Sequence, residues 1–327
     1  MQKKSDILIA GAGIIGLSLA LELHSRGAQV TVLERDTALS HASTAAAGML
    51  AVDDPHNPPA LHPLSRLSIH LYSGFLDRIA TLSGITVPYQ TSVTNQYADD
   101  GTITRLAEHS LDPRQLAAAL LAAVRAANID LREHTEARLV TEANGRHLHI
   151  ETTAGIFEPT QFIQTRGAWH APYTRPAKGQ MLRVQLPASL PLNEVHRNEH
   201  VYIVPRTTGP QAGSALIGAT VEDAGFDLTT HPSDLIHLRE LAARLVPAFA
   251  SEFATPPLEA WAGLRPATAD HLPLIGPREP GSSHFLATGH FRNGILLAPA
   301  TAAVLADLLE NKSPSIDLQY FNPARFL

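Results

Sequence analysis

A glycine-rich turn near the amino terminus constrains the fold of this chain more than any other sequence feature. A short apolar run at residues 7–9 leads into Gly11, Gly13 and Gly16, and a second apolar run ends at Glu34. Two buried strands joined through a G-x-G-x-x-G turn and a helix are typical of a βαβ unit. Gly11 then permits the tight turn, Gly13 lets the backbone approach a pyrophosphate, and Gly16 lets the helix pack closely on the strand.

The same segment predicts a binding site for an adenine dinucleotide. The N-terminus of the predicted helix would offer free N–H groups and a partial positive charge to phosphates. Glu34 follows at the spacing at which an acid accepts hydrogen bonds from a ribose diol. An ordinary strand–turn–helix is the alternative interpretation, but Gly27 at the helix end and Glu34 favour the dinucleotide site. Redox chemistry is therefore the expected function class.

A signal peptide is a second alternative for this segment, because Lys3 and Lys4 precede an apolar run at 7–23. However, three glycines and Glu22 lie within that run, and no small-residue cleavage site follows it. A membrane-spanning helix needs about twenty apolar residues with few charges. The sequence therefore predicts neither export nor membrane insertion, and the expected location is the cytoplasm.

Composition narrows the remaining function classes. The chain has 327 residues, of which 44% are apolar and 17% charged, with a net charge of -6. This length is enough for two domains with a large core, and no basic patch suits nucleic acid. Cysteine is absent, which excludes disulfides, cysteine ligands or nucleophiles, and a cofactor link through cysteine. The 17 histidines are scattered, and we predict no metal site.

The order of predicted elements indicates an α/β protein with a second sheet. Strand–helix alternation opens and closes the chain, whereas residues 178–220 have the short apolar runs of an antiparallel sheet. Asp112 followed by proline predicts a helix N-terminus, and Ser233 is the expected N-cap of a later helix. Residues 86–104 are expected to be irregular or weakly stranded, and the last helix is expected to start at Pro299.

The fold class expected from this order is a Rossmann-type dinucleotide-binding domain assembled from discontinuous segments. An α+β substrate domain, built on an antiparallel sheet, is inserted into it. The expected ranges are 1–52, 105–172 and 255–327 for the dinucleotide-binding domain, and 53–104 and 173–254 for the substrate domain.

Four blocks of sequence resemble the D-amino-acid oxidase family of flavoproteins, and within it the glycine oxidases. The blocks lie at both ends and in the middle of the chain. They read I-L-I-A-G-A-G-I-I-G at 7–16 with Glu34 beyond, S-T-A-A-A-G-M-L at 43–50, V-Y-I-V-P-R at 201–206 with I-G-A-T at 217–220, and W-A-G-L-R-P-A-T-A-D at 261–270 with G-H-F-R-N-G-I-L-L-A-P-A-T at 289–301.

This resemblance implies that the dinucleotide is FAD. In the family, the βαβ unit holds the ADP half, and the A-A-G-M segment and the C-terminal glycine loop lie near the isoalloxazine. Gly289 and Gly294 would let backbone N–H groups approach the flavin, and a helix N-terminus there would stabilise its anionic reduced form. The implied cofactor-binding residues are Gly11, Gly13, Ile14, Ile15, Gly16, Glu34, Arg35, Ala42, Ser43, Ala47, Gly48, Met49, Ala137, His290, Phe291, Arg292, Asn293, Gly294, Ile295 and Leu296.

The resemblance also implies three catalytic residues. Arg265, in G-L-R-P, matches the arginine that grips the substrate carboxylate, and a forked guanidinium suits that task. Tyr202 matches a tyrosine that helps bind the carboxylate, with a core strand aromatic as the alternative. Arg292 matches a second substrate-side arginine, with neutralisation of flavin or phosphate charge as the alternative. His290 is not expected to act as a base, because the neutral substrate amine needs none in this mechanism.

The implied reaction is the FAD-dependent oxidative deamination of glycine or of small D- or N-methyl amino acids. A hydride passes from Cα to flavin N5, and most of the catalysis is orientation. The imine hydrolyses to a keto acid and ammonia or an amine, and molecular oxygen reoxidises the flavin to give hydrogen peroxide. The alternatives are an FAD-dependent dehydrogenase that uses a quinone or protein acceptor, and a flavin-binding protein without amine oxidation.

Several expectations qualify this resemblance. The stretch at 84–110 is shorter than in typical glycine oxidases, which leaves pocket size and a homo-oligomer open. Arg166 stands where the family usually has a small residue, without a physical explanation from sequence. Val221 follows G-A-T where methionine is common, which would widen the pocket. Without cysteine, FAD is expected to bind non-covalently.

Overall fold

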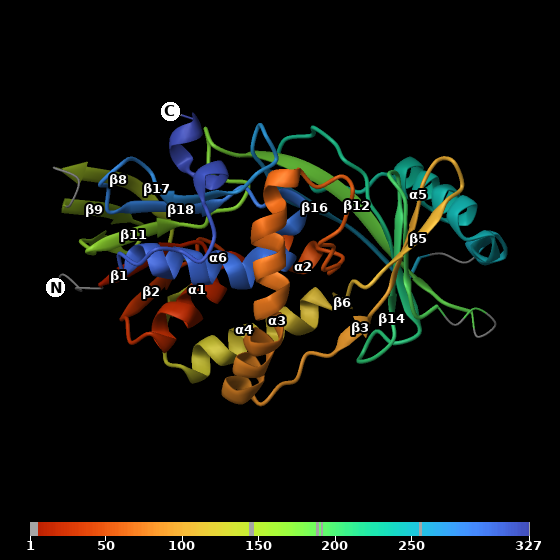
Figure 1. Ribbon diagram of the computed structural model, residues 1–327, viewed down its shortest axis with the longest axis horizontal. Helices are drawn as coiled ribbons and strands as arrows, with labels where there is room; N and C mark the ends of the chain where they lie inside the picture. Colours follow the sequence, from red (N-terminus) through yellow and green to blue (C-terminus); the bar gives the residue numbers. More distant parts are fainter. Residues whose placement is uncertain (1–5, 144–146, 188–189, 191, 255–256, 327) are drawn as a thin grey trace.

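A computed structural model describes residues 6–143, 147–187, 190, 192–254 and 257–326 of the chain. Figure 1 shows two large sheets, one at each end of the long axis, with helices α1, α3, α4 and α6 gathered around the first. This arrangement confirms the predicted α/β class with a second, largely antiparallel sheet.

The first sheet has six strands in the order β17-β18-β11-β1-β2-β7. All neighbours run parallel except β17 and β18, which are antiparallel. Its strands are β1 (Ile7–Ala10), β2 (Val30–Leu33), β7 (Asp130–Arg132), β11 (Gln161–Gln164), β17 (Leu274–Pro277) and β18 (His284–Thr288). The predicted βαβ unit is therefore present at its centre, with β1 and β2 as neighbours.

Both faces of this sheet are covered, as the apolar runs of its strands require. Ile7 and Ile9 pack into the core shared with the helices α1 (Ile14–Ser25), α3 (His62–Ser83), α4 (Pro113–Ala126) and α6 (Gly294–Leu309). Leu8 and Ala10 point the other way, into a cluster with the small antiparallel sheet β8 (Ala137–Ala143), β9 (His147–Thr152) and β10 (Gly155–Phe157).

The second sheet has seven strands in the order β16-β12-β15-β14-β13-β4-β5, antiparallel except for the parallel pair β13–β4. One face packs against α5 (Pro232–Leu245) and the 3-10 helix η2 (Pro247–Ala254). Its strands are β4 (Thr94–Tyr97), β5 (Ile103–Leu106), β12 (Arg175–Gln185), β13 (Val195–Arg197), β14 (Tyr202–Arg206), β15 (Ser214–Gly218) and β16 (Glu259–Ala267).

Short elements join these layers: α2 (Ala42–Ala45), η1 (Pro59–Leu61), β3 (Tyr89–Thr91), β6 (Ser110–Leu111), η3 (Phe291–Asn293), η4 (Gln319–Phe321) and η5 (Pro323–Phe326). The domain ranges given above stay a prediction. Strand β16 was counted there with the dinucleotide-binding domain, but it pairs with β12 along Arg175–Arg183 and so belongs to the second sheet.

The prediction for the last helix was wrong, because α6 begins at Gly294 and contains Pro299. A proline inside a helix leaves the carbonyl four residues earlier without its N–H partner. Here Tyr72 from α3 donates its hydroxyl to the Ile295 carbonyl at 2.9 Å. Ser68, also on α3, donates its hydroxyl to the next carbonyl, that of Leu296, at 2.5 Å. Side chains from α3 thus replace the lost hydrogen bonding and let the helix continue.

The structure also bears on three local predictions: it confirms one helix N-terminus, corrects another, and places short strands in the weakly stranded stretch. Asp112 is the N-cap of α4, and its carboxylate accepts a hydrogen bond from the Arg114 backbone N–H at 2.9 Å. The N-cap of α5 is His231 rather than Ser233, because Pro232 occupies the first helical position. Residues 86–104 hold β3, β4 and the start of β5, whose pairing in the sheets outweighs their weak local preference.

One described segment, Phe291–Leu309, is long and apolar enough to cross a membrane by length and composition. Its hydropathy averages 1.2, and 72% of it is buried inside the protein. Figure 1 shows α6 lying alongside α1 and crossed by α3, and both of these helices pack against it. Its apolar character is therefore explained by packing in the core. Residues 7–23, considered above as a signal peptide, form β1 and most of α1.

Candidate active site

One cavity runs from the first βαβ unit to the face of the second sheet that is not covered by α5. It is lined by the glycine turn, by residues 41–43 and 45–49 in and around α2, by the start of α6 and by residues of β12, β14 and β16. Every residue predicted from sequence for the cofactor or for catalysis lines this cavity except Gly16 and Leu296.

Gly11 and Gly16 are required in the turn for different steric reasons. Gly11 has a φ of 114°, and a Cβ there would lie 2.6 Å from the Thr165 carbonyl oxygen. A Cβ on Gly16 would collide with the Gly11 carbonyl, so Gly16 allows α1 to pack on the turn and does not face the cavity. Leu296 is also buried in the core, at 1% exposure.

Glu34 is held at the tip of β2 by backbone hydrogen bonds. Its Oε2 accepts from the Ala12 N–H at 2.8 Å, and its Oε1 accepts from the Asp36 N–H at 3.0 Å. A carboxylate has about four acceptor positions, so these bonds fix the side chain and leave capacity for a ribose hydroxyl. The carboxylate lines the cavity while remaining only 8% exposed.

Residues 42–49 pass between the two sheets, which explains their small side chains. Ser43 caps α1 from outside, because its Oγ accepts a hydrogen bond from the Ile14 N–H at 2.9 Å. Gly48 has a φ of 87°, and a Cβ there would collide with the Leu111 carbonyl. On the other side, buried Arg206 donates to the Ala47 carbonyl at 2.9 Å. The segment is thus held by partners from both halves of the molecule.

The start of α6 forms another wall of the cavity. The first N–H groups of a helix have no partner within it and carry a partial positive charge, and Asn293, Gly294 and Ile295 all line the cavity here. His290 precedes this helix, and its Nε2 lies 3.0 Å from the Thr301 hydroxyl. Burial lowers the pKa of His290 to about 3, so this imidazole is neutral at physiological pH.

Arg265 and Tyr202 meet at the end of the cavity formed by the second sheet. Arg265 lies on β16 and donates from Nη1 to the carbonyls of Thr220 at 3.1 Å and Lys178 at 3.3 Å. Gly179 makes room for it, because a Cβ there would collide with the guanidinium. Burial lowers the pKa of Arg265, which nonetheless remains protonated because guanidinium is so strongly basic.

Tyr202 lies on β14 opposite Gly218 of β15. A Cβ on Gly218 would lie 2.6 Å from the tyrosine oxygen, so the glycine admits the ring across the strand pair. Burial raises the pKa of Tyr202, and the charges of Arg265 and Arg292 oppose that rise. The hydroxyl is therefore protonated at neutral pH and close enough to both arginines to feel their charge.

Arg292 reaches the same end of the cavity from η3. Its Nη2 lies 3.4 Å from Oδ2 of Asp54, a residue in the connection between α2 and α3. The structure therefore brings the three predicted catalytic residues together, from β14, β16 and η3, and adds an acid to them.

A family model described as FAD dependent oxidoreductase matches residues 6–110 and 101–308. The chain belongs to the FAD-dependent oxidoreductase family. The bifunctional protein ThiO/ThiG of Trichormus variabilis is 35% identical to it over 98% of this chain, which spans 55% of the length of that relative. The glycine oxidase of Geobacillus kaustophilus is 29% identical over 100% of this chain and 98% of its own length. The crystal structure of glycine oxidase from Geobacillus kaustophilus superposes with a TM-score of 0.89, at 27% identity over 99% of both chains.

The cavity fits the FAD that this family uses. Gly11 and Gly13 leave backbone exposed where a pyrophosphate has to approach, and the N-termini of α1 and α6 both face the cavity. A Cβ on Gly13 would come within 3.3 Å of the Ser43 hydroxyl and crowd this cradle. The helix ends and glycines together suit an anionic, extended dinucleotide, and Glu34 suits its ribose.

Sequence reasoning predicted Arg35 at the dinucleotide end of this oxidoreductase but missed the cationic and aromatic residues around it. Arg166 donates to the Ala137 carbonyl and lines the cavity, and the Arg35 guanidinium lies 4.4 Å from the ring centre of Trp169. Trp169 also packs against His41 at 4.5 Å between ring centres. A positional signal was available, because Arg166 and Trp169 directly follow β11, and ligands bind beyond the carboxyl ends of parallel strands. Val221, expected to widen the pocket, is 67% exposed and does not line it.

Among the described residues, Glu34, Asp36 and His41 form a group whose ligand atoms lie within 4.8 Å of one another. These atoms have protein partners. Oδ2 of Asp36 lies 2.9 Å from His41 Nε2 and accepts from Arg35 Nε at 3.0 Å, and Glu34 accepts two backbone N–H groups. The contacts are explained without an ion, and the absence of a metal from the reaction stays a prediction.

Proposed function

We propose that this chain catalyses the FAD-dependent oxidative deamination of glycine or of small D- or N-methyl amino acids, with oxygen as the electron acceptor and hydrogen peroxide as a product. The observation that carries this proposal is the single cavity that joins the dinucleotide end at Glu34 to Arg265 and Tyr202. A carboxylate bound at these two residues would place the rest of a small amino acid along the wall that η3 and α6 form.

Arg265 would bind the substrate carboxylate. Its Nη1 is tied to the two carbonyls of Lys178 and Thr220, which fixes the plane of the guanidinium before substrate arrives. Its remaining N–H groups can donate to a carboxylate, and charge-assisted bonds of this kind are about twice as strong as neutral ones. The Tyr202 hydroxyl would donate a further hydrogen bond to the same carboxylate.

The residues around the reacting carbon would act by orientation. When bound, FAD supplies the acceptor for the hydride that leaves the substrate Cα. His290 is neutral and engaged with Thr301, which supports a mechanism in which the substrate enters with a neutral amine and no side chain removes its proton. Holding the reacting atoms in place can contribute about 7–11 kcal/mol to lowering a barrier.

The comparisons support this proposal at the level of the family. The relatives named above include a glycine oxidase that matches along nearly its whole length, whereas this chain spans 55% of the bifunctional relative. We therefore propose glycine or a small D- or N-methyl amino acid as the substrate, a cytoplasmic location and the absence of nucleic-acid or membrane partners, and we leave a homo-oligomer open. Because cysteine is absent, we also propose that FAD binds non-covalently and leaves the denatured protein.

The experiment that tests this proposal is anaerobic mixing of the yellow holoprotein with glycine, D-alanine and sarcosine, followed by visible flavin absorbance. Bleaching by at least one of them is the expected outcome, and the order of the rates identifies the preferred substrate. Air is then admitted. Reoxidation with peroxide formed in proportion to substrate supports an oxidase, whereas slow reoxidation without peroxide points to a dehydrogenase. Absence of bleaching with all three amino acids contradicts the proposal.

A further inference from the structure

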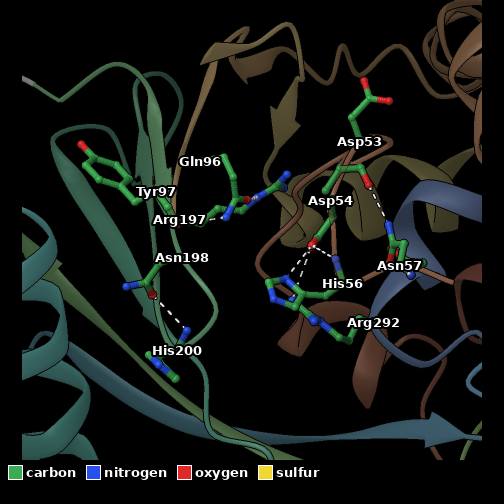
Figure 2. Close-up of polar contacts among 12 residues, drawn as sticks. Asp53, Asp54, His56, Asn57, Gln96, Tyr97, Arg197, Asn198, His200 and Arg292 are labelled. Atoms are coloured by element: carbon green, nitrogen blue, oxygen red, sulfur yellow. Dashed lines mark hydrogen bonds and ion pairs between the residues drawn. The ribbon is translucent and has the colours of Figure 1, made fainter. Parts of the chain in front are cut away.

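An acidic residue lies inside the cavity beside the proposed substrate-binding arginines. Asp54 is 5% exposed and lines the cavity. Its Oδ2 lies 3.4 Å from Nη2 of Arg292, and Figure 2 shows Asp54, His56 and Arg292 grouped together. Asp54 lies outside the four sequence blocks that carry the family resemblance, so the resemblance assigns it no role.

The carboxylate of Asp54 is held in place by its own segment. Its Oδ1 accepts from the His56 backbone N–H at 3.0 Å and lies 3.1 Å from His56 Nδ1. Three residues after Asp54, the Asn57 side-chain oxygen accepts from the Asn293 amide at 2.8 Å. The segment that carries the acid is thereby fastened to the turn that carries Arg292.

The neighbouring charges show which arginine pairs with Asp54. Arg197 is also near, but it pairs with buried Glu108, at 3.0 Å between Nη1 and Oε2. Burial by itself would raise the pKa of Asp54, yet the charges of Arg197 and Arg292 hold it below its usual value. The acid is therefore ionised at neutral pH, and Arg292 is the cavity-lining cation with which it pairs.

The two arginines of the cavity therefore differ in available charge. Arg292 has the Asp54 carboxylate beside it. Arg265 donates to two backbone carbonyls, and among the described residues no carboxylate forms an ion pair with it. A ligand carboxylate at Arg265 meets a cation that has no ion-pair partner among the described residues, whereas one at Arg292 meets a cation already paired with an anion. A second ligand carboxylate at Arg292 would lie close to the Asp54 carboxylate, and this repulsion between like charges would weaken the binding of a dicarboxylate.

We propose that Asp54 is a specificity-determining residue that neutralises Arg292, so that the site takes ligands with one carboxylate, at Arg265, and rejects ligands with two. This inference rests on the proposed amino-acid oxidase function and adds a charge rule to it. Removal of the Asp54 charge would free Arg292 to bind a second carboxylate.

The test compares two ligands of similar size, propionate with one carboxylate and malonate with two. Each is titrated into the FAD-loaded protein, and binding is followed by the change in visible flavin absorbance, without turnover. In the wild type, propionate is expected to bind more tightly than malonate. In Asp54→Asn, which keeps the size of the side chain, the ratio of the two dissociation constants is expected to move toward malonate by about tenfold or more, as for a newly formed buried charge pair.

Two control variants sharpen this test. Asp53→Asn removes the adjacent charge, which pairs at the surface with Arg66 at 3.2 Å and does not line the cavity, and it should leave the ratio unchanged. Asp54→Asn combined with Arg292→Gln should return the ratio to the wild-type value, because the freed cation is gone. Asp54→Ser repeats the measurement if Asp54→Asn fails to retain FAD.

Three outcomes would overturn the charge rule: an unchanged ratio in Asp54→Asn and Asp54→Ser, an equal shift in Asp53→Asn, or a shift that persists without Arg292. Glycine reduction of the wild-type flavin, measured on the same preparations, separates this failure from a wider one. If glycine bleaches the wild-type flavin, only the proposed role of Asp54 is contradicted, and the proposed function stands. If no amino acid bleaches it and neither carboxylate binds, the proposed function falls as well.

Discussion

The two ends of the cavity recognise their ligands by different means. At the dinucleotide end, the groups in place are the backbone of Gly11 and Gly13, the start of α1 and a glutamate tied to backbone N–H groups. At the other end, the groups that we propose to bind the substrate are the side chains of Tyr202 and Arg265, carried by separate strands of the second sheet. The central motif of the first end is a continuous stretch of about thirty residues, to which segments such as 165–169 add, whereas the other end is assembled wholly from distant residues.

This difference predicts how substitutions at each end will behave. The dinucleotide end depends on close approach of the backbone to FAD. Substitutions that add atoms there should therefore weaken FAD binding. A side-chain site depends on charge and hydrogen bonds, so it should fail through removed groups and lose turnover while FAD stays bound. The following variants test that division.

The largest effect is expected from Arg265→Ala. Loss of a buried, hydrogen-bonded charge partner costs about 2–5 kcal/mol, which is roughly a 30-fold to 5,000-fold drop in kcat/KM. Flavin absorbance of the purified variant should remain close to the wild-type value. Steady-state kinetics with the preferred amino acid measure the effect. Arg278→Ala, which removes a surface arginine 3.7 Å from Glu279, is the control. Near-wild-type kcat/KM in Arg265→Ala would contradict the assignment.

Gly11→Ala should show the opposite pattern. The new methyl group would lie 2.6 Å from the Thr165 carbonyl oxygen at a φ of 114°, and residues forced into such backbone regions cost about 1–3 kcal/mol each before any clash. We expect a lower melting temperature and weaker FAD binding, measured by thermal unfolding and by flavin titration of the apoprotein. Gly74→Ala, in open space on α3, should be neutral or slightly stabilising. Full FAD affinity in Gly11→Ala would break the comparison.

Tyr202→Phe removes only a hydroxyl, so a smaller effect is expected. A hydrogen bond to a charged group is worth about 1.5–3 kcal/mol, and the loss should appear mainly in KM if the hydroxyl serves ground-state binding of the carboxylate. Tyr97→Phe removes a hydroxyl on the same sheet that pairs with His196 at 2.8 Å, away from the cavity lining. Equal kinetic effects of the two variants would show that the Tyr202 hydroxyl supports the sheet and does not bind the substrate carboxylate.

The smallest effect is expected from Tyr72→Phe, which concerns the helix whose start faces the cavity. The Ile295 carbonyl would lose its partner, and an unsatisfied buried group costs about 1–3 kcal/mol. The free energy of unfolding from denaturant titration should fall by about that amount, with little change in kcat. Tyr320→Phe, at a residue 54% exposed, is the matched control. Unchanged stability in Tyr72→Phe would mean that the interior of α6 does not need the α3 hydroxyl.

The parts of the fold that could be predicted from sequence are those with local causes. The βαβ unit follows from apolar runs and glycine spacing, and the α4 N-terminus follows from Asp112 and its proline. The prediction failed where a distant segment supplied the missing interaction. Pro299 reads locally as a helix start, but α3 side chains let α6 begin five residues earlier. Strands β4 and β5 have weak local signals and exist through their pairing in the sheet.

The candidate site divides in the same way. The sequence by itself determined the dinucleotide motif, the exclusion of cysteine chemistry and, through its resemblance, a set of residues of which all but Gly16 and Leu296 line the cavity, because these depend on spacing and residue type. Only the tertiary structure decided that Asp54 neutralises Arg292, and that Arg166 and Trp169 stand at the dinucleotide end. The physical reason is distance along the chain: a charge pair between residues 238 positions apart leaves no local pattern and forms only when the fold closes around it.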